Sequence, residues 1–150
     1  TPGCTTEGQE LRDVYKQFKS LKTQILGVSR DSIKSHENFK AKQEFPFELL
    51  SDPEEKVCKA FDVMKLKSMY GREYIGVDRS TFIINSEGKV INEWRSVKVK
   101  GHVDEVLEVI KSIASYFGAN CSNKTFPNLL PQPVTNARLN FSVGSKDLMP

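Results

Sequence analysis

Apolar residues recur every three to four positions near the start of the chain, which predicts an amphipathic helix over residues 5–22. Its apolar face is formed by Leu11, Val14, Tyr15, Phe18 and Leu21. A continuously apolar run at 24–29 follows, and such runs usually lie in the interior of a parallel sheet. A second amphipathic pattern predicts a helix over 31–43, capped by Asp31, with Ile33 and Phe39 directed inward.

Residues 45–50 are typical of a short edge strand, because Pro46 has no N–H to donate to a neighbouring strand. Asp52 and Pro53 then predict a helix start, with the aspartate as the N-cap and the proline in the first turn. The expected buried face of this short helix consists of Val57, Ala60 and Phe61.

The second half of the chain begins with a basic, glycine-containing segment at 63–78 that predicts an irregular connection. Segments 80–85 and 89–94 flank a glycine-containing turn and predict a β-hairpin. A final amphipathic helix is expected over 102–117. Helices that alternate with strands in this order indicate an α/β fold with a mixed sheet.

The helical periodicity stops at Gly118, and the last part of the chain contains Pro127, Pro131 and Pro133 and few charges. We therefore expect one domain over residues 1–117 and a disordered or extended, irregular tail over 118–150. A chain of 150 residues is long enough to bury a sizeable core as one domain.

Composition narrows the possible functions. The net charge of +3 is spread along the chain, so a nucleic-acid partner is not expected. No apolar run approaches the roughly 18 residues of a membrane-spanning helix, and the first residues do not resemble a signal peptide. The chain has three cysteines, Cys4, Cys58 and Cys121, and this small, odd number argues against a disulfide framework. They indicate a reducing compartment, either the cytoplasm or an organelle stroma or matrix.

Cys4 lies where the first helix is expected to start. The N–H groups of a first helical turn have no intrahelical partner and carry partial positive charge, which favours a thiolate at that point. Pro2 suits such a first turn. The sequence pattern leaves two interpretations open, a reactive thiol or a small, buried and inert cysteine.

Five separate segments, at 1–7, 49–53, 70–72, 79–82 and 98–103, resemble the peroxiredoxin Q subfamily, also called bacterioferritin-comigratory proteins. The resemblance extends over about residues 1–117. It implies a thioredoxin-like fold and a thiol peroxidase that reduces hydrogen peroxide and organic hydroperoxides without a cofactor or metal.

The resemblance also assigns residues to the site. Cys4 matches the peroxidatic cysteine, and Thr1 matches the threonine that donates a hydrogen bond to the sulfur or the peroxide. Arg79 matches the arginine that stabilises the thiolate and the charge of the transition state, and Glu7 matches the acid that orients this arginine. Read without these neighbours, Arg79 would more simply form a surface ion pair.

Two features depart from the subfamily pattern. Some relatives carry a resolving cysteine at the position of Gln9 and others at that of Lys40, and this chain has no cysteine at either position. Cys58 and Cys121 are the remaining candidates for that role. We expect a one-cysteine cycle in which an external thiol such as thioredoxin reduces Cys4. The resemblance also places a central strand upstream of Thr1, so we expect a truncated sheet, either as a fragment or with another chain filling the gap. A monomer or weak dimer is expected.

The remaining candidates favour structural roles. We expect His36 to face solvent and His102 to be neutral and structural at its helix start. No histidine or cysteine pair has metal-ligand spacing, and the cations Lys65, Lys67 and Arg72 are expected on a solvated face. A catalytically silent interaction module is the alternative function, whereas a disulfide oxidoreductase is disfavoured because there is no C-x-x-C motif.

Overall fold

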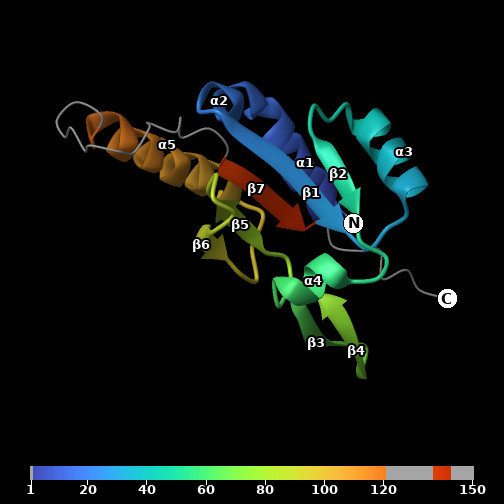
Figure 1. The fold of residues 1–150 in the computed structure, drawn as a ribbon. Coiled ribbons are helices and arrows are strands. Elements are labelled where there is room, and N and C mark those ends of the chain that lie inside the picture. Colours follow the sequence, from blue (N-terminus) through green and yellow to red (C-terminus); the bar gives the residue numbers. More distant parts are fainter. Residues whose placement is uncertain (1, 121–136, 143–150) are drawn as a thin grey trace.

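The computed structural model describes residues 2–120 and 137–142, with side chains for residues 2–115. Five strands form one sheet in the order β2-β1-β7-β5-β6, and β3 and β4 form a separate two-stranded sheet (Figure 1). The elements, in chain order, are α1 (Pro2–Asp13), α2 (Tyr15–Ser20), β1 (Thr23–Ser29), α3 (Ile33–Gln43), β2 (Glu48–Ser51), α4 (Lys56–Ala60), β3 (Met64–Met69), β4 (Arg72–Val77), β5 (Thr81–Ile84), β6 (Val90–Trp94), α5 (His102–Asn120) and β7 (Ala137–Ser142).

The main sheet is mixed, as the sequence predicts. β1 pairs in parallel with β2 on one side and with β7 on the other. β5 runs antiparallel to both β7 and β6. β2 lies at the edge of this sheet, in agreement with the edge strand expected around Pro46.

The resemblance led us to expect a sheet without one of its central strands, and the structure places β7 in the centre of the sheet, between β1 and β5. This strand pairs with β1 from Ala137 to Ser142 and with β5 from Arg138 to Phe141. The sequence at 137–142 alternates strictly between apolar and polar residues, which is the pattern of a strand. Residues 118–120 of the expected tail continue α5 instead, and 121–136 and 143–150 lie outside the described residues.

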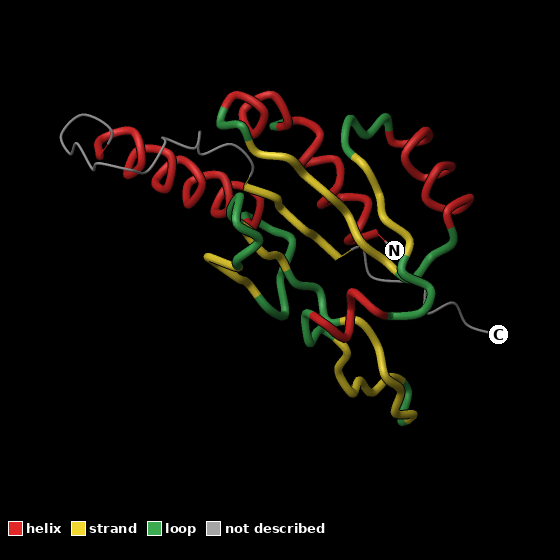
Figure 2. The backbone as a smooth tube through the Cα atoms, in the orientation of Figure 1, coloured by secondary structure: helices red, strands yellow, loops and turns green. Residues whose placement is uncertain are grey.

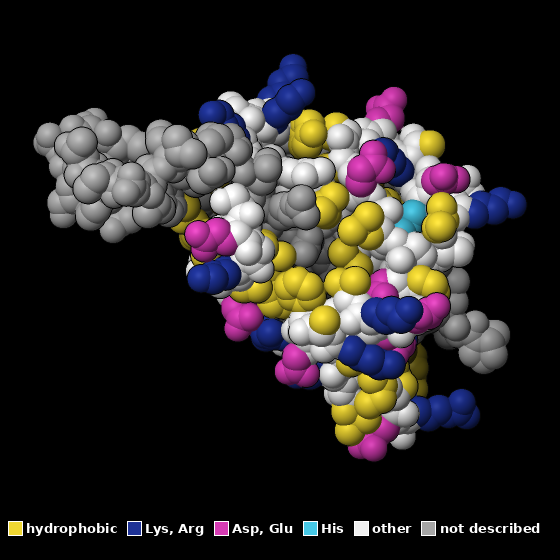
Figure 3. All heavy atoms as spheres, viewed as in Figure 1, with side chains coloured by type: hydrophobic (Ala, Val, Ile, Leu, Met, Phe, Trp, Pro, Cys, Tyr) yellow, Lys and Arg dark blue, Asp and Glu magenta, His cyan; other side chains and the backbone are white. Residues whose placement is uncertain are grey.

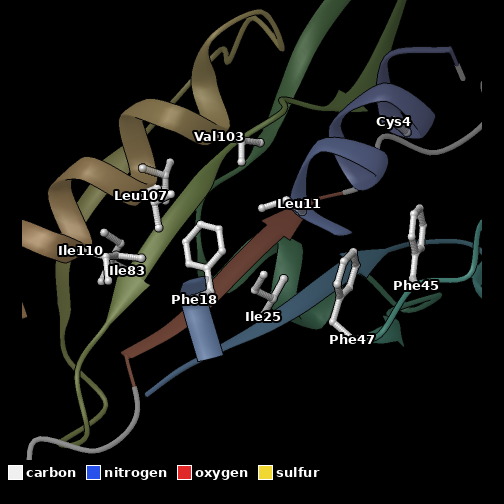
Figure 4. Packing of buried hydrophobic residues seen from close by; sticks show 11 residues of the cluster. Cys4, Leu11, Phe18, Ile25, Phe45, Phe47, Ile83, Val103, Leu107 and Ile110 are labelled. Atoms are coloured by element: carbon white, nitrogen blue, oxygen red, sulfur yellow. The ribbon is translucent and has the colours of Figure 1, made fainter. Parts of the chain in front are cut away.

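The two faces of the main sheet are covered differently. Successive side chains of a strand point to opposite faces of a sheet, and in β5 Ile83 belongs to the main core whereas Phe82 belongs to a second cluster. The main core lies between the sheet and helices α1, α2 and α5 (Figure 4), and its buried members are Cys4, Leu11, Phe18, Ile25, Phe45, Phe47, Ile83, Val103, Val106, Leu107 and Ile110. The second cluster contains Cys58, Val63, Val77 and Phe82.

The two helices around β2 differ from the expectations at their ends. Ser32, not Asp31, caps α3, because its Oγ accepts from the backbone N–H of Ser35. Ile33 is 66% exposed, so the expectation that it points inward was wrong. In α4 the residue that joins a core is Cys58, whereas Val57 is exposed.

The segment 63–78, expected to be irregular, instead forms the β3–β4 hairpin that projects from the main sheet (Figure 2). Its strands are joined by Tyr70 and Gly71, both with positive φ of 50° and 76°. Two consecutive residues with positive φ make the turn whose twist matches a hairpin, and a glycine at the second position adopts it without strain. The expected helix at 5–22 is likewise divided, into α1 and α2.

Candidate active site

The sheet topology brings together two segments that lie far apart in the sequence. β5 runs in the opposite direction to β7 and β1. The residues that precede β5 therefore lie beside the carboxyl ends of β1 and β7. Arg79 stands two residues before β5, and its side chain reaches the first turns of α1. Cys4 and Glu7, three residues apart, share the buried face of this helix with Gly8 and Leu11.

One guanidinium group joins the cysteine and the glutamate. The Nη2 of Arg79 donates to the Sγ of Cys4 over 3.3 Å, and its Nη1 donates to the Oε2 of Glu7 over 3.0 Å. Cys4 and Glu7 are each only 1% exposed, whereas the Arg79 side chain is 19% exposed. The structure thus brings together three of the four residues that the sequence assigned to a peroxide site.

Burial controls the charge of Glu7. Removal from water raises the pKa of this carboxyl from 4.5 to about 7, and the Arg79 charge and hydrogen bond lower it only in part. Glu7 therefore titrates close to neutral pH although it is paired with a cation. Its hydrogen bond to Nη1 holds one edge of the guanidinium and leaves Nη2 directed at the sulfur.

Gly3 belongs to this site, although the sequence reasoning gave it no role. A Cβ at this position would lie 3.0 Å from Nη2 and 3.2 Å from Nη1 of Arg79. The missing side chain therefore allows the guanidinium to lie against the first turn of α1. The available signal was a glycine inside a helix, where glycine is unfavourable and needs a reason.

Cys58 does not join this cluster. Cys58 is buried in the second core cluster, and its thiol has a pKa raised to about 11, chiefly by burial and by hydrogen bonding to Asp52. Thr1 and Cys121 lie outside the described residues.

Both histidines are buried, so the expectation that His36 faces solvent was wrong. Its Nε2 lies 2.5 Å from the Oγ of Ser29, and burial lowers its pKa. His102 is buried at the start of α5 with its Nε2 2.8 Å from the Oγ1 of Thr81, and burial lowers its pKa as well. His102 therefore has the neutral, structural character that its position predicts.

The cations on the hairpin have separate partners. Lys65 pairs with Asp62, and Lys67 donates to the carbonyl oxygen of Val77. Cationic and anionic side chains are interspersed over the face shown in Figure 3. Within residues 2–120 and 137–142, no group of three or more His, Cys, Asp or Glu could hold a metal ion, and no helix is long and apolar enough to cross a membrane.

Comparison with known proteins identifies the class. Residues 1–93 match the AhpC/TSA family, and the chain belongs to this family of thiol peroxidases. It is 54% identical over 114 residues to peroxiredoxin Bcp of Xanthomonas campestris pv. campestris, a match that covers 76% of this chain and 71% of the relative. It is 52% identical to peroxiredoxin Bcp of Bacillus subtilis, again over 114 residues, with 76% and 73% of the two chains covered.

Solved structures give the same result. The chain superimposes with a TM-score of 0.72 on the bacterioferritin comigratory protein of Xanthomonas campestris, at 53% identity, covering 76% of this chain and 73% of that one. The resemblance seen in the sequence is therefore confirmed. Within its family the chain falls among the Bcp, or peroxiredoxin Q, proteins, and its fold is thioredoxin-like.

Proposed function

We propose that this peroxiredoxin reduces hydrogen peroxide and organic hydroperoxides with the Cys4 thiolate as the nucleophile. The observation that carries the proposal is the Arg79 guanidinium, which donates to the sulfur of Cys4 and to the carboxylate of Glu7. The related Xanthomonas campestris protein has been described for its alkyl peroxide reduction activity, which supports the inclusion of organic hydroperoxides.

The chemical step is a displacement at oxygen. The thiolate attacks the terminal oxygen of the hydroperoxide, an S–O bond forms and the O–O bond breaks. The sulfur is oxidised to a sulfenic acid, and the departing oxygen takes the electron pair and then a proton to leave as water or an alcohol. Negative charge moves from the sulfur to the departing oxygen during this step.

Each site residue has a role in this step. Arg79 supplies a positive charge and planar donors, so it stabilises the thiolate first and the departing oxygen afterwards. Glu7 orients Arg79 through the 3.0 Å contact. Thr1 donates a hydrogen bond to the sulfur or the peroxide, a role that we assign by the resemblance alone.

We propose a one-cysteine cycle for recycling. An external thiol attacks the sulfenic acid, releasing water and leaving a mixed disulfide, and a second thiol then frees Cys4. Thioredoxin is the proposed reductant. Cys58 is a poor resolving residue, because burial and a pKa of about 11 leave it almost entirely as the thiol at neutral pH. Cys121 is the second, less favoured candidate for that role.

We further propose that the protein acts as a monomer or weak dimer in a reducing compartment, the cytoplasm or an organelle stroma or matrix. The odd, small number of cysteines supports the reducing compartment.

Mass spectrometry after one equivalent of hydrogen peroxide tests the proposal. We expect Cys4 to gain one oxygen and Cys4→Ser to lose all turnover, while the matched variant Cys58→Ser keeps it. Arg79→Lys retains a charge but not two parallel donors, and should slow the reaction about 100-fold, as loss of a transition-state donor does in other enzymes. Turnover that persists in Cys4→Ser would refute the proposal. A wild-type protein without turnover would favour the silent interaction module.

A further inference from the structure

The short loop 78–80, which we call the arginine loop, is held on both sides by other segments. On one side, the backbone N–H of Asp78 donates to the carbonyl oxygen of Val63 over 2.7 Å. On the other side, the N–H of Val97 donates to the carbonyl oxygen of Arg79 over 2.9 Å. The backbone from which the Arg79 side chain extends is therefore fixed by two neighbouring segments.

The carboxylate of Asp78 adds a second set of contacts to the loop at 96–97. Its Oδ2 accepts from the backbone N–H of Ser96 over 2.9 Å, and the Ser96 hydroxyl donates to Oδ2 over 3.0 Å and to Oδ1 over 3.2 Å. Ser96 has a φ of +49°, a left-handed conformation that is unusual for a residue with a side chain. This conformation accompanies an arrangement in which its N–H and its hydroxyl both meet one carboxylate.

The segment that carries Ser96 is itself anchored. The Nη1 of Arg95 donates to the carbonyl oxygen of Asp62 over 2.8 Å, and its guanidinium carbon lies 5.1 Å from the ring centre of Phe82. Asp62 precedes Val63, the acceptor for the arginine loop on its other side. The arginine loop thus lies between two segments that are joined to each other by Arg95.

We propose that Asp78 and Ser96 are positioning residues that set where the Arg79 guanidinium stands over Cys4. The guanidinium can meet Cys4 and Glu7 at the same time only from a limited range of backbone positions, so we expect a displaced arginine loop to displace the guanidinium. Its two contacts in the site, 3.3 Å to Sγ and 3.0 Å to Oε2, leave little room for displacement. A shift of about 1 Å in a catalytic group can cost about 100-fold in rate.

This inference rests on the proposed function and adds residues that do not touch the reacting atoms. A purely structural role would predict something different, namely a loss of stability with unchanged chemistry at Cys4. The two roles are separated by comparing two reactions of the same sulfur. The peroxide reaction needs the guanidinium both at the thiolate and at the departing oxygen, whereas alkylation by iodoacetamide needs only the thiolate.

The test compares Asp78→Ala, Asp78→Asn and Ser96→Ala with Glu73→Ala, which removes an exposed carboxylate from β4 instead. We expect Asp78→Ala to lower kcat/KM for hydrogen peroxide about tenfold, which is less than the loss of a whole transition-state donor because the guanidinium is displaced and not removed. The ratio of peroxide rate to alkylation rate should fall as well. Asp78→Asn should stay within about threefold of wild type, because its carbonyl oxygen still accepts from Ser96. Ser96→Ala should fall in between, and Glu73→Ala should match wild type.

A wild-type ratio of the two rates in both Asp78→Ala and Ser96→Ala would overturn the inference while leaving Arg79 and the proposed function intact. An equal loss in Asp78→Asn and Asp78→Ala would overturn it too, because the conservative variant should rescue. Thermal unfolding identifies any variant that does not fold, and Ser96→Ala then decides. If the wild type itself has no turnover that depends on Cys4, the proposed function fails, and this inference, which rests on it, fails with it.

Discussion

Replacement of Glu7 by glutamine should change how stability depends on pH. The carboxyl is 1% exposed, and burial raises its pKa from 4.5 to about 7 in the folded protein. Below pH 4.5 the group is protonated in both the folded and the unfolded chain. Between pH 4.5 and about 7 the folded chain holds a proton that the unfolded chain has released, so stability falls as pH rises through this range.

The expected magnitude follows from the shift. Each unit of pKa difference corresponds to about 1.4 kcal/mol, so from pH 5 to pH 8.5 wild-type Glu7 should remove about 2 to 3 kcal/mol of folding free energy. Glutamine has no proton to lose, so this contribution disappears in Glu7→Gln. The difference in unfolding free energy between Glu7→Gln and the parent should therefore increase by that amount over the same pH interval, in favour of the variant.

Urea unfolding at pH 5 and at pH 8.5 measures this difference. Both proteins should carry Cys4→Ser, so that the thiol that contacts the same guanidinium is absent from the comparison. Glu37→Gln, an exposed acid on α3, serves as the control and should change little between the two pH values. A Glu7→Gln difference that stays constant to within about 0.5 kcal/mol, near the error of the extrapolation, would refute the reasoning.

Three further predictions follow from contacts in the structure. Gly3→Ala should push the Arg79 guanidinium away from a Cβ built 3.0 Å from Nη2, so peroxidase assays should show a slower reaction while the unfolding free energy changes by less than about 1 kcal/mol. Gly8→Ala should lower stability in urea by about 1–2 kcal/mol, because its Cβ would lie 2.3 Å from Cζ of Phe45, and unchanged stability would contradict this packing. Deletion of 121–150 should lower the thermal midpoint and the peroxidase rate, because β1 and β5 lose the backbone partners that β7 provides. Each backbone group left buried without a partner costs about 1–3 kcal/mol, and an unaltered circular-dichroism melt would argue against the role of β7.

The local half of the site was predictable from the sequence. A cysteine at a helix start and a glutamate three residues later share a helix face whatever the rest of the chain does. The contact with Arg79 was not predictable from composition or periodicity, because it joins positions 75 residues apart. Only the resemblance to peroxiredoxins predicts this contact, because it places the two segments in one fold.

The parts that sequence reasoning missed depend on partners distant in the chain. The alternation at 137–142 is a weak signal in a polar, proline-containing context, and only pairing with β1 and β5 makes it a central strand. Burial of His36 depends on Ser29 at the end of β1, which its own helix does not reveal. The hairpin at 63–78 does have a local signal, because Gly71 can adopt the positive φ that its turn with Tyr70 requires.

The charges at the site explain why a carboxyl with a raised pKa is useful beside the arginine. Arg79 provides one positive charge to two acids, so an ionised Glu7 and a Cys4 thiolate together leave one negative charge in excess in a buried place. Burial raises the pKa of Glu7 to about 7, so the carboxyl takes up a proton close to neutral pH. A protonated carboxyl still has an oxygen that accepts from Nη1, so it continues to orient the guanidinium without competing for its charge. In the proposed mechanism the field of Arg79 then acts mainly on the sulfur and on the departing oxygen. Burial of Glu7 therefore lowers the stability of the folded state above neutral pH. In the proposed mechanism the same burial lets the Arg79 charge act more strongly on the sulfur and on the departing oxygen.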